Sequence, residues 1–546
     1  MRTTYCCDNE KFQDYYVSQA GNGLSGFAGS RYQRGHGLGS FLKGLIKTSA
    51  PLLKKGAISI GKQALKTGLS MAQNYLNDDQ KIKYKEITIV PALPLEVPEG
   101  KDVVCKQTLY LKMALIHEQS CECVKSELDL FAVPLTQTSV EDGRFSEVGP
   151  IATLTSNMPI EFKVEGAESE YLDLSNSYIY VRSKILKGDG SNLENDSEVG
   201  PVNLLLQSLF SRVEMSIGET QITRPTNLYP YRAYIETLLS FGQTPKNSQL
   251  TAALWYKDTA GHMDSHDGDE NKGYKARKSL FAGNKTVDMI GKLHLDLMFQ
   301  DRYLLNLTPI TLRLSRSKNE FCLMCTDAFK VKLEKVVLKI RRVKLNPAVS
   351  LAHAEALQLG TAKYPIRRVE CLTYTVDAGT LSHDKENLFT GQLPKRLVLG
   401  MVTNTSFNGT FTSNPFNFQH FNVNYIELVA DGKQVLGKPL QPTFGTTNTY
   451  IESYASLFMG TEMMYKDEGN DISRDEYKSG FTLFAFDLTP DLEESGHVQL
   501  VKQGIVKLSL QFSEALAATI NVIVYAEFEN MIEINKDRKV LFDYVG

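Results

Sequence analysis

Long hydrophobic runs and a hydrophobic leader are both missing from this sequence. No stretch of about 18 or more apolar residues occurs in its 546 residues, so the sequence predicts no membrane-spanning helix. Residues 1–14 are polar and acidic, which predicts that the chain is not secreted through a signal peptide. Tryptophan occurs once, and the 8 cysteines are scattered. Such cysteines indicate free thiols in a reducing, intracellular compartment.

The signatures of common enzymes are also missing. The sequence has no G-x-x-x-x-G-K-[ST], no H-E-x-x-H and no G-x-S-x-G motif,. The glycine-rich stretch Gly35–Gly39 is too short for a dinucleotide loop and follows no predicted strand. The sequence therefore indicates no catalytic residue, no cofactor and no small-molecule substrate, and we expect no enzymatic activity.

Two groups of metal-ligand residue types need a separate interpretation. The first combines one histidine with cysteines far apart in the chain, namely His117, Cys121, Cys123, Cys322 and Cys325. The second is a crowded stretch that holds His262, Asp264, His266, Asp267, Asp269 and Glu270. Neither has the spacing of a known zinc or EF-hand site. Ordinary thiols and a solvated loop are the favoured interpretations, and a metal-dependent enzyme using residues 262–270 is an alternative.

A basic segment precedes the main body of the chain. Residues 15–77 contain 8 Lys and Arg and no Asp or Glu. We expect residues 1–40 to be a flexible glycine-rich terminus, 41–77 a basic amphipathic helical segment and 78–112 a proline-containing linker. The helical segment suits an anionic membrane or DNA, or packing inside an assembly. The candidate residues for membrane or DNA contact are Phe41, Leu42, Lys43, Leu45, Ile46, Lys47, Lys54, Lys55, Lys62 and Lys66.

The main body has the period-two alternation of β-strands. Apolar residues alternate with polar ones around residues 160–164, 310–314, 506–512 and 520–524,. Turn signals such as Gly188–Gly190 and Asp431-Gly432 separate these runs,. Helical patterns are rare, and residues 231–239 are the best short one. The pattern predicts an all-β body.

An internal repeat divides this body. Pro201-Val202-Asn203, Val213-Glu214-Met215, a turn at Gly218 and Tyr234-Ile235-Glu236 follow one another in the first half. The second half has, in the same order, Pro415-Phe416-Asn417, Ile426-Glu427-Leu428, a turn at Gly432 and Tyr450-Ile451-Glu452. The repeat predicts two copies of one β-sandwich, each about 200 residues long and so large enough for an eight-stranded jelly roll with long loops. One large irregular β domain is the alternative.

Several blocks resemble a known family. They are residues 120–131 (SCECVKSELDLF), 199–203 (VGPVN), 228–240 (LYPYRAYIETLLS) and 254–264 (LWYKDTAGHMD). Over residues 113–546 the chain is similar to capsid proteins of Polinton (Maverick) virus-like transposons and adintoviruses, found in animal genomes. Residues 34–76 resemble adenovirus-like minor capsid or core proteins, which fits a fusion of two neighbouring reading frames.

The resemblance implies a structural coat protein. It implies a double jelly roll, with the first jelly roll at 113–345 and the second at 346–546, that forms homotrimeric capsomers of an icosahedral shell. The implied partners are further copies of the chain, minor capsid or vertex proteins, and DNA or lipid through the N-terminal segment. The implied location is the virion, with intracellular assembly. We expect Tyr229, Tyr231, Tyr234 and Tyr450 to act in assembly. A lectin-like carbohydrate-binding protein without assembly is the alternative.

Overall fold

The first β-sandwich consists of two four-stranded antiparallel sheets. A computed structural model describes residues 136–154, 158–445, 448–490, 492 and 498–542. One sheet has the order β1-β10-β3-β7, with β1 at Val140–Val148, β10 at Phe329–Leu345, β3 at Glu170–Lys187 and β7 at Val287–Gly291. The other has the order β2-β8-β5-β6, with β2 at Ile160–Val164, β8 at Ile310–Arg316, β5 at Phe210–Ile217 and β6 at Thr220–Gln221.

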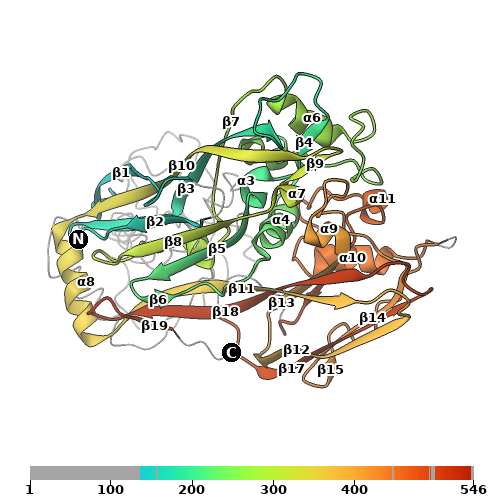
Figure 1. Ribbon diagram of the computed structural model, residues 1–546. Helices are drawn as coiled ribbons and strands as arrows, with labels where there is room; N and C mark the ends of the chain where they lie inside the picture. Colours follow the sequence, from blue (N-terminus) through green and yellow to red (C-terminus); the bar gives the residue numbers. More distant parts are fainter. Residues whose placement is uncertain (1–135, 155–157, 446–447, 491, 493–497, 543–546) are drawn as a thin grey trace, which may run out of the picture. The chain divides into compact units, whose positions relative to one another are not determined.

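The second β-sandwich repeats this arrangement (Figure 1). Its first sheet has the order β11-β18-β13-β16, with β11 at Ala362–Val376, β18 at Ile520–Ile534, β13 at Arg396–Thr403 and β16 at Leu483–Asp487, and β19 (Val540–Phe542) pairs with β18. Its second sheet has the order β12-β17-β14-β15, with β12 at Ser382–Gln392, β17 at Gln503–Phe512, β14 at Val423–Ala430 and β15 at Lys433–Gln434.

The two sandwiches correspond strand by strand. When the strands of each are taken in chain order and the short β4 and β9 are set aside, both follow the same path through two facing sheets. Even a β-bulge recurs, between Phe210 and Arg212 of β5 and between Val423 and Tyr425 of β14,. This confirms the predicted repeat, and the eight-stranded arrangement confirms the predicted double jelly roll.

The strands form where the sequence alternates. In β2 the residues Ile160, Phe162 and Val164 are buried, and the two charged residues between them are exposed. The hairpin β14–β15 turns at Asp431 and Gly432, both of which have positive φ, as a two-residue primed turn requires. Period-two patterning and turn chemistry therefore place each strand with one face toward a core.

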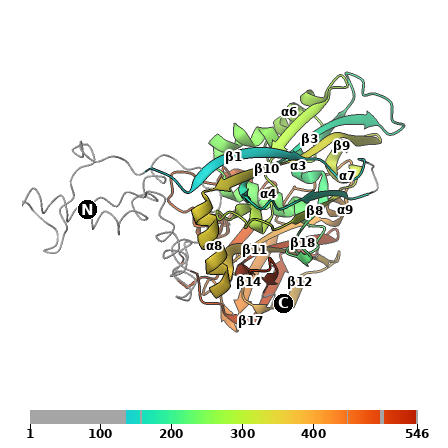
Figure 2. The same ribbon diagram turned by 90° about the vertical axis from the view of Figure 1, so that its left-hand side faces the viewer.

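Short helices and a small two-stranded sheet occupy the connections. In the first half these are β4 (Val199–Pro201), α3 (Leu205–Ser208), α4 (Tyr229–Ser240), α5 (Gln243–Lys246), η3 (Gln249–Ala253), α6 (Lys272–Phe281), η4 (Asp296–Phe299), α7 (Asn319–Cys322) and β9 (Leu323–Cys325). The second half has α9 (Asn404–Asn408), α10 (Ile451–Met459) and α11 (Arg474–Tyr477). Between the sandwiches runs α8 (Pro347–Leu359), which Figure 2 shows along their common edge.

Two hydrophobic cores hold the body together. One is the interior of the second sandwich, between its own sheets. The other fills the first sandwich and continues onto the facing side of the second, where Val398 and Tyr525 belong to it. The two sandwiches thus share a core and lie in one compact unit. Among the described residues, no helix is long and apolar enough to cross a membrane.

Candidate functional site

Helix α4 is buried where the two sandwiches meet (Figure 1). Pro230 stands in its first turn, where a fixed φ favours helix initiation,. Every residue from Tyr229 to Leu239 is buried. The ring of Tyr234 stacks on Phe416 of the second sandwich, with centroids 4.2 Å apart and planes 1° from parallel. Aromatic packing therefore joins the two halves of the chain at this helix.

The other tyrosines predicted to act in assembly are also buried. Tyr231 packs against Phe407 and Phe416, while the hydroxyl of Tyr229 donates to Gln207 at 2.5 Å. Tyr450 stacks with Phe444 and Tyr477 and donates to the Arg474 carbonyl at 3.2 Å.

Each of these tyrosine side chains is therefore used inside its own chain. Their role in assembly stays a prediction, and burial limits it to packing inside the chain rather than contact with a neighbour.

A network of charged side chains surrounds α4. The Arg232 guanidinium donates to Glu236 at 2.9 Å and to Asp296 of η4 at 2.6 Å. Nδ1 of His294 lies 2.5 Å from the other oxygen of Glu236. The backbone N–H of Val369, on β11 of the second sandwich, donates to Asp296 at 3.2 Å. Burial raises the pKa of Asp296, and the charge of Arg232 and its hydrogen bond oppose that shift,.

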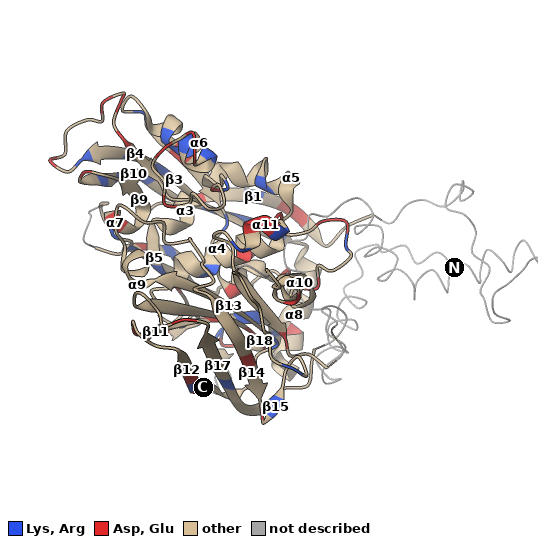
Figure 3. Ribbon diagram, turned by 90° about the vertical axis from the view of Figure 1, so that its right-hand side faces the viewer, with Lys and Arg blue, Asp and Glu red and all other residues tan. Residues whose placement is uncertain are grey.

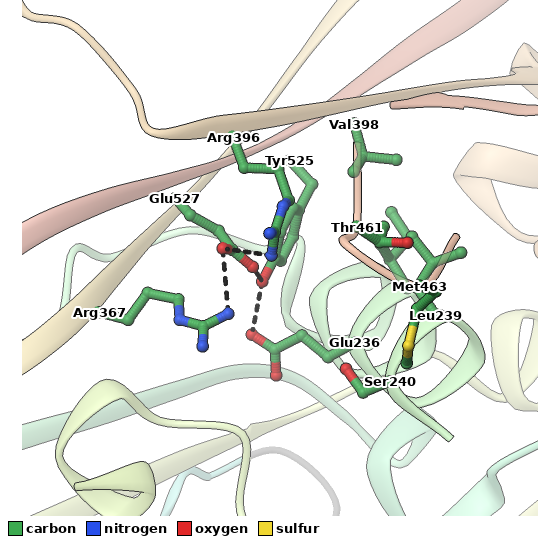
Figure 4. Close-up of a pocket in the computed structure, with 11 residues that line it drawn as sticks. Glu236, Leu239, Ser240, Arg367, Arg396, Val398, Thr461, Met463, Tyr525 and Glu527 are labelled. Carbon is green, nitrogen blue, oxygen red and sulfur yellow. Dashed lines mark hydrogen bonds and ion pairs between the residues drawn. The ribbon is translucent and has the colours of Figure 1, made fainter. Parts of the chain in front are cut away.

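A narrow pocket between the sandwiches continues this network (Figure 4). Tyr525 of β18 donates to Glu527 at 2.8 Å and to Glu236 of α4 at 3.3 Å. Glu527 also pairs with Arg367 at 3.1 Å and with Arg396 at 3.2 Å. The carboxylates are thus shared among several cations and a phenol, which is the condition for burying charge without a large penalty.

This arrangement suits orientation better than catalysis. Removing one partner of a buried ion pair costs several kcal/mol, so each pair holds its two elements at one separation. Most of the pairs lie within one sandwich. The contacts that cross include the hydrogen bonds of Glu236 with Tyr525 and of Asp296 with Val369. The ion pair of Arg224 with Glu370 of β11 also crosses. The site therefore fixes the position of one sandwich against the other.

A second set of polar contacts joins the long segment between α4 and β7 (residues 241–286, the insert of the first sandwich) to the second sandwich. The Arg277 guanidinium of α6 pairs with Asp258 at 2.6 Å, both fully buried. Asp258 also accepts from the side-chain amide of Asn414 at 3.0 Å. Asp264 accepts from the Asn414 backbone at 2.6 Å and from Asn417 at 2.7 Å. Burial raises the pKa of Asp264, against these hydrogen bonds.

The contacts of residues 262–270 bear on the alternative of a metal-dependent enzyme. Asp264 faces the second sandwich, as does His266, whose Nε2 lies 3.0 Å from the Phe411 carbonyl. Asp269 instead pairs with Lys275, and Glu270 accepts from Ser265. Within the described part of the chain, no three His, Cys, Asp or Glu side chains are grouped so that they could hold a metal ion. Asp264 and His266 therefore serve the contact between the sandwiches, while Asp269 and Glu270 pair within their own segment.

The remaining predicted residues divide into two groups. Cys322 and Cys325 are buried free thiols, and burial raises the pKa of each to about 12, which makes them unreactive. His117, Cys121, Cys123 and the ten membrane- or DNA-contact candidates between Phe41 and Lys66 lie outside the described residues.

Sequence reasoning missed the charged residues between the sandwiches. Glu236 and Asp296 stand inside the repeated pattern, where Tyr-Ile-Glu and an apolar-Asp-apolar triplet each occur twice. An acidic residue inside such a repeated triplet is only a weak signal of burial, because the matching Glu452 of the second copy has a side chain that is 61% exposed. Arg367, Arg396 and Glu527 carry no comparable signal, because charged residues on strands are usually at the surface.

Comparisons of sequence give one clear relative. No family model matches the chain. Uncharacterized protein F54H12.2 of Caenorhabditis elegans is 27% identical over 429 residues, which are 76% of this chain and 100% of that protein.

Comparison with solved structures finds similar chains in viral particles and viral capsid proteins. A chain from the 3.5 Å structure of the Sputnik virophage matches with a TM-score of 0.56 and 11% identity, over 80% of this chain and 96% of that chain. The Faustovirus major capsid protein matches with a TM-score of 0.46 and 9% identity, over 74% of this chain and 92% of that one. The likeness to the Sputnik chain shows a shared fold.

Proposed function

We propose that this chain is a structural capsid subunit that assembles as trimeric capsomers into a closed icosahedral shell. The observation that carries the proposal is the duplication of one jelly roll within one compact unit. The strand orders match one for one, and a shared core with hydrogen bonds to buried carboxylates holds the two copies together. A trimer of such chains has six similar sandwiches around its three-fold axis. Its outline is therefore close to six-fold.

The family proposal is a capsid protein of the Polinton and adintovirus type. It rests on the sequence blocks at 120–131, 199–203, 228–240 and 254–264, and the fold shared with the Sputnik virophage chain supports it. The block at 228–240 contains α4, which joins the sandwiches.

The proposed working place of the protein is the virion, after assembly inside the cell. The proposed partners are other copies of the chain and minor capsid or vertex proteins. Residues 41–77 are proposed to contact encapsidated DNA or membrane lipid, because they combine an apolar stripe with lysines and no acidic residue,. The proposed role is structural and includes no catalytic step.

The test is the mass and shape of the purified full-length chain. Light scattering should give three times the chain mass of 61.1 kDa for free capsomers, with hexagonal outlines in negative-stain images, and a far larger mass if closed shells form. A stable monomer under capsid-assembly conditions would refute the proposal. Glycan binding by that monomer would then favour the lectin-like alternative.

A further inference from the structure

Lys246 of α5 is a buried lysine at the contact between the two sandwiches. Its side-chain amine donates to the Leu238 carbonyl of α4 at 2.8 Å and to the Asn470 carbonyl of the second sandwich at 2.6 Å. The amine also lies 5.4 Å from the centre of the Trp255 ring, and only 2% of Lys246 is exposed. Figure 3 shows α5 of the first sandwich above α11 of the second, on the side of the molecule where this contact lies. The amine therefore connects the backbones of the two sandwiches inside the molecule.

The hydrogen bonds of this amine suit its neutral form. A neutral amine has two hydrogens, and the two carbonyls accept both of them. An ammonium has a third hydrogen, and within the part of the chain that the structure describes Lys246 has no further acceptor and no ion pair. A positive charge at this place would therefore be buried without a direct counter-ion, which is costly.

The charged side chains that face Lys246 lie beyond hydrogen-bond distance. Three of them, Asp471, Glu476 and Lys257, pair with one another. A fourth, Glu468, is exposed and stands beside Gly242, just before α5. Burial lowers the pKa of Lys246 to about 7; the charges of Asp471 and Glu476 oppose this shift, and that of Lys257 adds to it,. The amine thus changes its charge near neutral pH.

The Asn470 carbonyl belongs to the connection between α10 and α11 (residues 460–473). This connection contains three non-glycine residues with positive φ, namely Glu462, Tyr465 and Asp471. Such a backbone conformation costs energy and persists only where surrounding contacts hold it. Lys246 supplies one of these contacts, and Lys257 supplies another through the carbonyl and the carboxylate of Asp471.

We propose that proton uptake by Lys246 opens the contact between α5 and the α10–α11 connection. Above neutral pH the neutral amine binds both carbonyls, and the connection lies against α5. Below neutral pH the amine is an ammonium, which water solvates better than two carbonyls in a buried site. The connection then moves away from α5 and water reaches Lys246. This pH-sensitive contact is a property of the single chain and does not depend on the proposed shell.

The size of the effect follows from the two pKa values of the amine. An exposed lysine has a pKa of about 10.4, whereas that of the buried Lys246 is about 7. The open form therefore binds the proton more tightly than the closed form. The open fraction rises as the pH falls toward 7 and levels off below that value. Between pH 8 and pH 6 the equilibrium constant for opening should rise about tenfold.

The first experiment uses the single tryptophan of the chain as a reporter. Trp255 is 1% exposed and lies beside the amine, so a charge that appears there acts on the ring and changes its emission. In the full-length chain, Trp255 emission should show a step with a midpoint near pH 7. Lys246→Met should abolish this step. Constant emission of the unmodified chain between pH 6 and pH 8 would overturn the proposal.

The matched control is Lys292→Met. Burial also lowers the pKa of Lys292, to about 8, but its amine lies over the ring of Phe299 at 4.7 Å. The Lys292→Met chain should keep the step in Trp255 emission. Loss of the step in this variant, with the step retained in Lys246→Met, would assign the titration to the wrong lysine and overturn the proposal.

The second experiment measures the opening itself. Hydrogen exchange of the backbone in residues 462–472, corrected for the intrinsic exchange rate at each pH, gives the equilibrium constant for opening. Protection in the unmodified full-length chain should be about tenfold lower at pH 6 than at pH 8. In Lys246→Met it should be equal at the two pH values. Equal protection in the unmodified chain, or a tenfold change that survives in Lys246→Met, would contradict the proposal.

A second variant keeps the test valid if Lys246→Met does not fold. The side-chain amide of glutamine has two hydrogens for carbonyl acceptors and takes up no proton at these pH values. Lys246→Gln should therefore show no step in Trp255 emission and equal protection of residues 462–472 at pH 6 and pH 8. A step or a tenfold change in this variant would show that another group controls the contact.

Discussion

At the scale of single residues, Tyr234 is the clearest contact between the sandwiches. Its ring is fully buried and stacked on Phe416. Replacing it by Ala removes an aromatic ring from a packed core, so Tyr234→Ala should lower the free energy of unfolding by roughly 3–5 kcal/mol. Urea unfolding followed by fluorescence measures this loss. Tyr234→Phe keeps the ring and should retain most of the stability; equal losses for both substitutions would contradict the role of stacking.

A second residue-scale prediction concerns pH. Burial lowers the pKa of His353, whose ring lies 3.0 Å from the Tyr171 hydroxyl, to about 4. In the unfolded chain this pKa is about 6.5. Below pH 6.5 the unfolded state therefore takes up a proton that the folded state refuses. Stability is full above pH 6.5 and should fall toward pH 4, at about 1 kcal/mol per pH unit from this residue.

The measurement for His353 is chemical denaturation at pH 7 and pH 5. His420, whose pKa burial also lowers to about 4, adds to the same trend. His353→Phe should therefore reduce the difference between the two pH values, and His353→Phe with His420→Phe should reduce it further. An unchanged difference in both variants would show that these histidines are not the cause.

At the scale of elements, Gly273 allows the start of α6 to pack closely against the backbone at Tyr256 and Lys257. A Cβ atom at this position would lie 2.3 Å from the Lys257 carbonyl oxygen, and a backbone atom cannot move aside as a side chain can. Gly273→Ala should therefore cost about 1–3 kcal/mol through overpacking. Thermal unfolding measures the cost. Gly149→Ala is the control, since nothing lies within 4 Å of its Cβ position, and it should change stability by less than about 0.5 kcal/mol.

At the scale of the whole molecule, the ion pairs of Arg232 hold the two carboxylates, those of Glu236 and Asp296, that contact the second sandwich. Arg232→Met would leave Glu236 and Asp296 buried without this cation, at a cost of roughly 3–5 kcal/mol,. Because the second sandwich keeps a core of its own, we expect calorimetry of this variant to show the first sandwich melting earlier, as a separate transition. Arg313→Met, on the exposed side of β8, should melt like the unmodified chain.

The repeated β architecture could be predicted from local patterns in the sequence. Alternation in Ile160–Val164 and the turn at Asp431-Gly432 are local signals, and the structure forms a strand and a hairpin there. The order of the repeated triplets was enough to predict two sandwiches, because a duplicated fold keeps its buried positions in register. The repeat also pointed to α4, through Tyr234-Ile235-Glu236.

The surfaces that the two copies turn toward each other could not be predicted in this way, because packing in the folded chain selects them. Tyr234 and Tyr450 stand at matching places in the sequence, yet one stacks across the sandwiches and the other packs inside the second. Arg396 and Glu527 look like surface residues until β13 and β18 bring them together beneath α4. A duplicated chain has two similar units and one contact between them. Symmetry between the units is therefore broken by packing, which no local pattern of residues records.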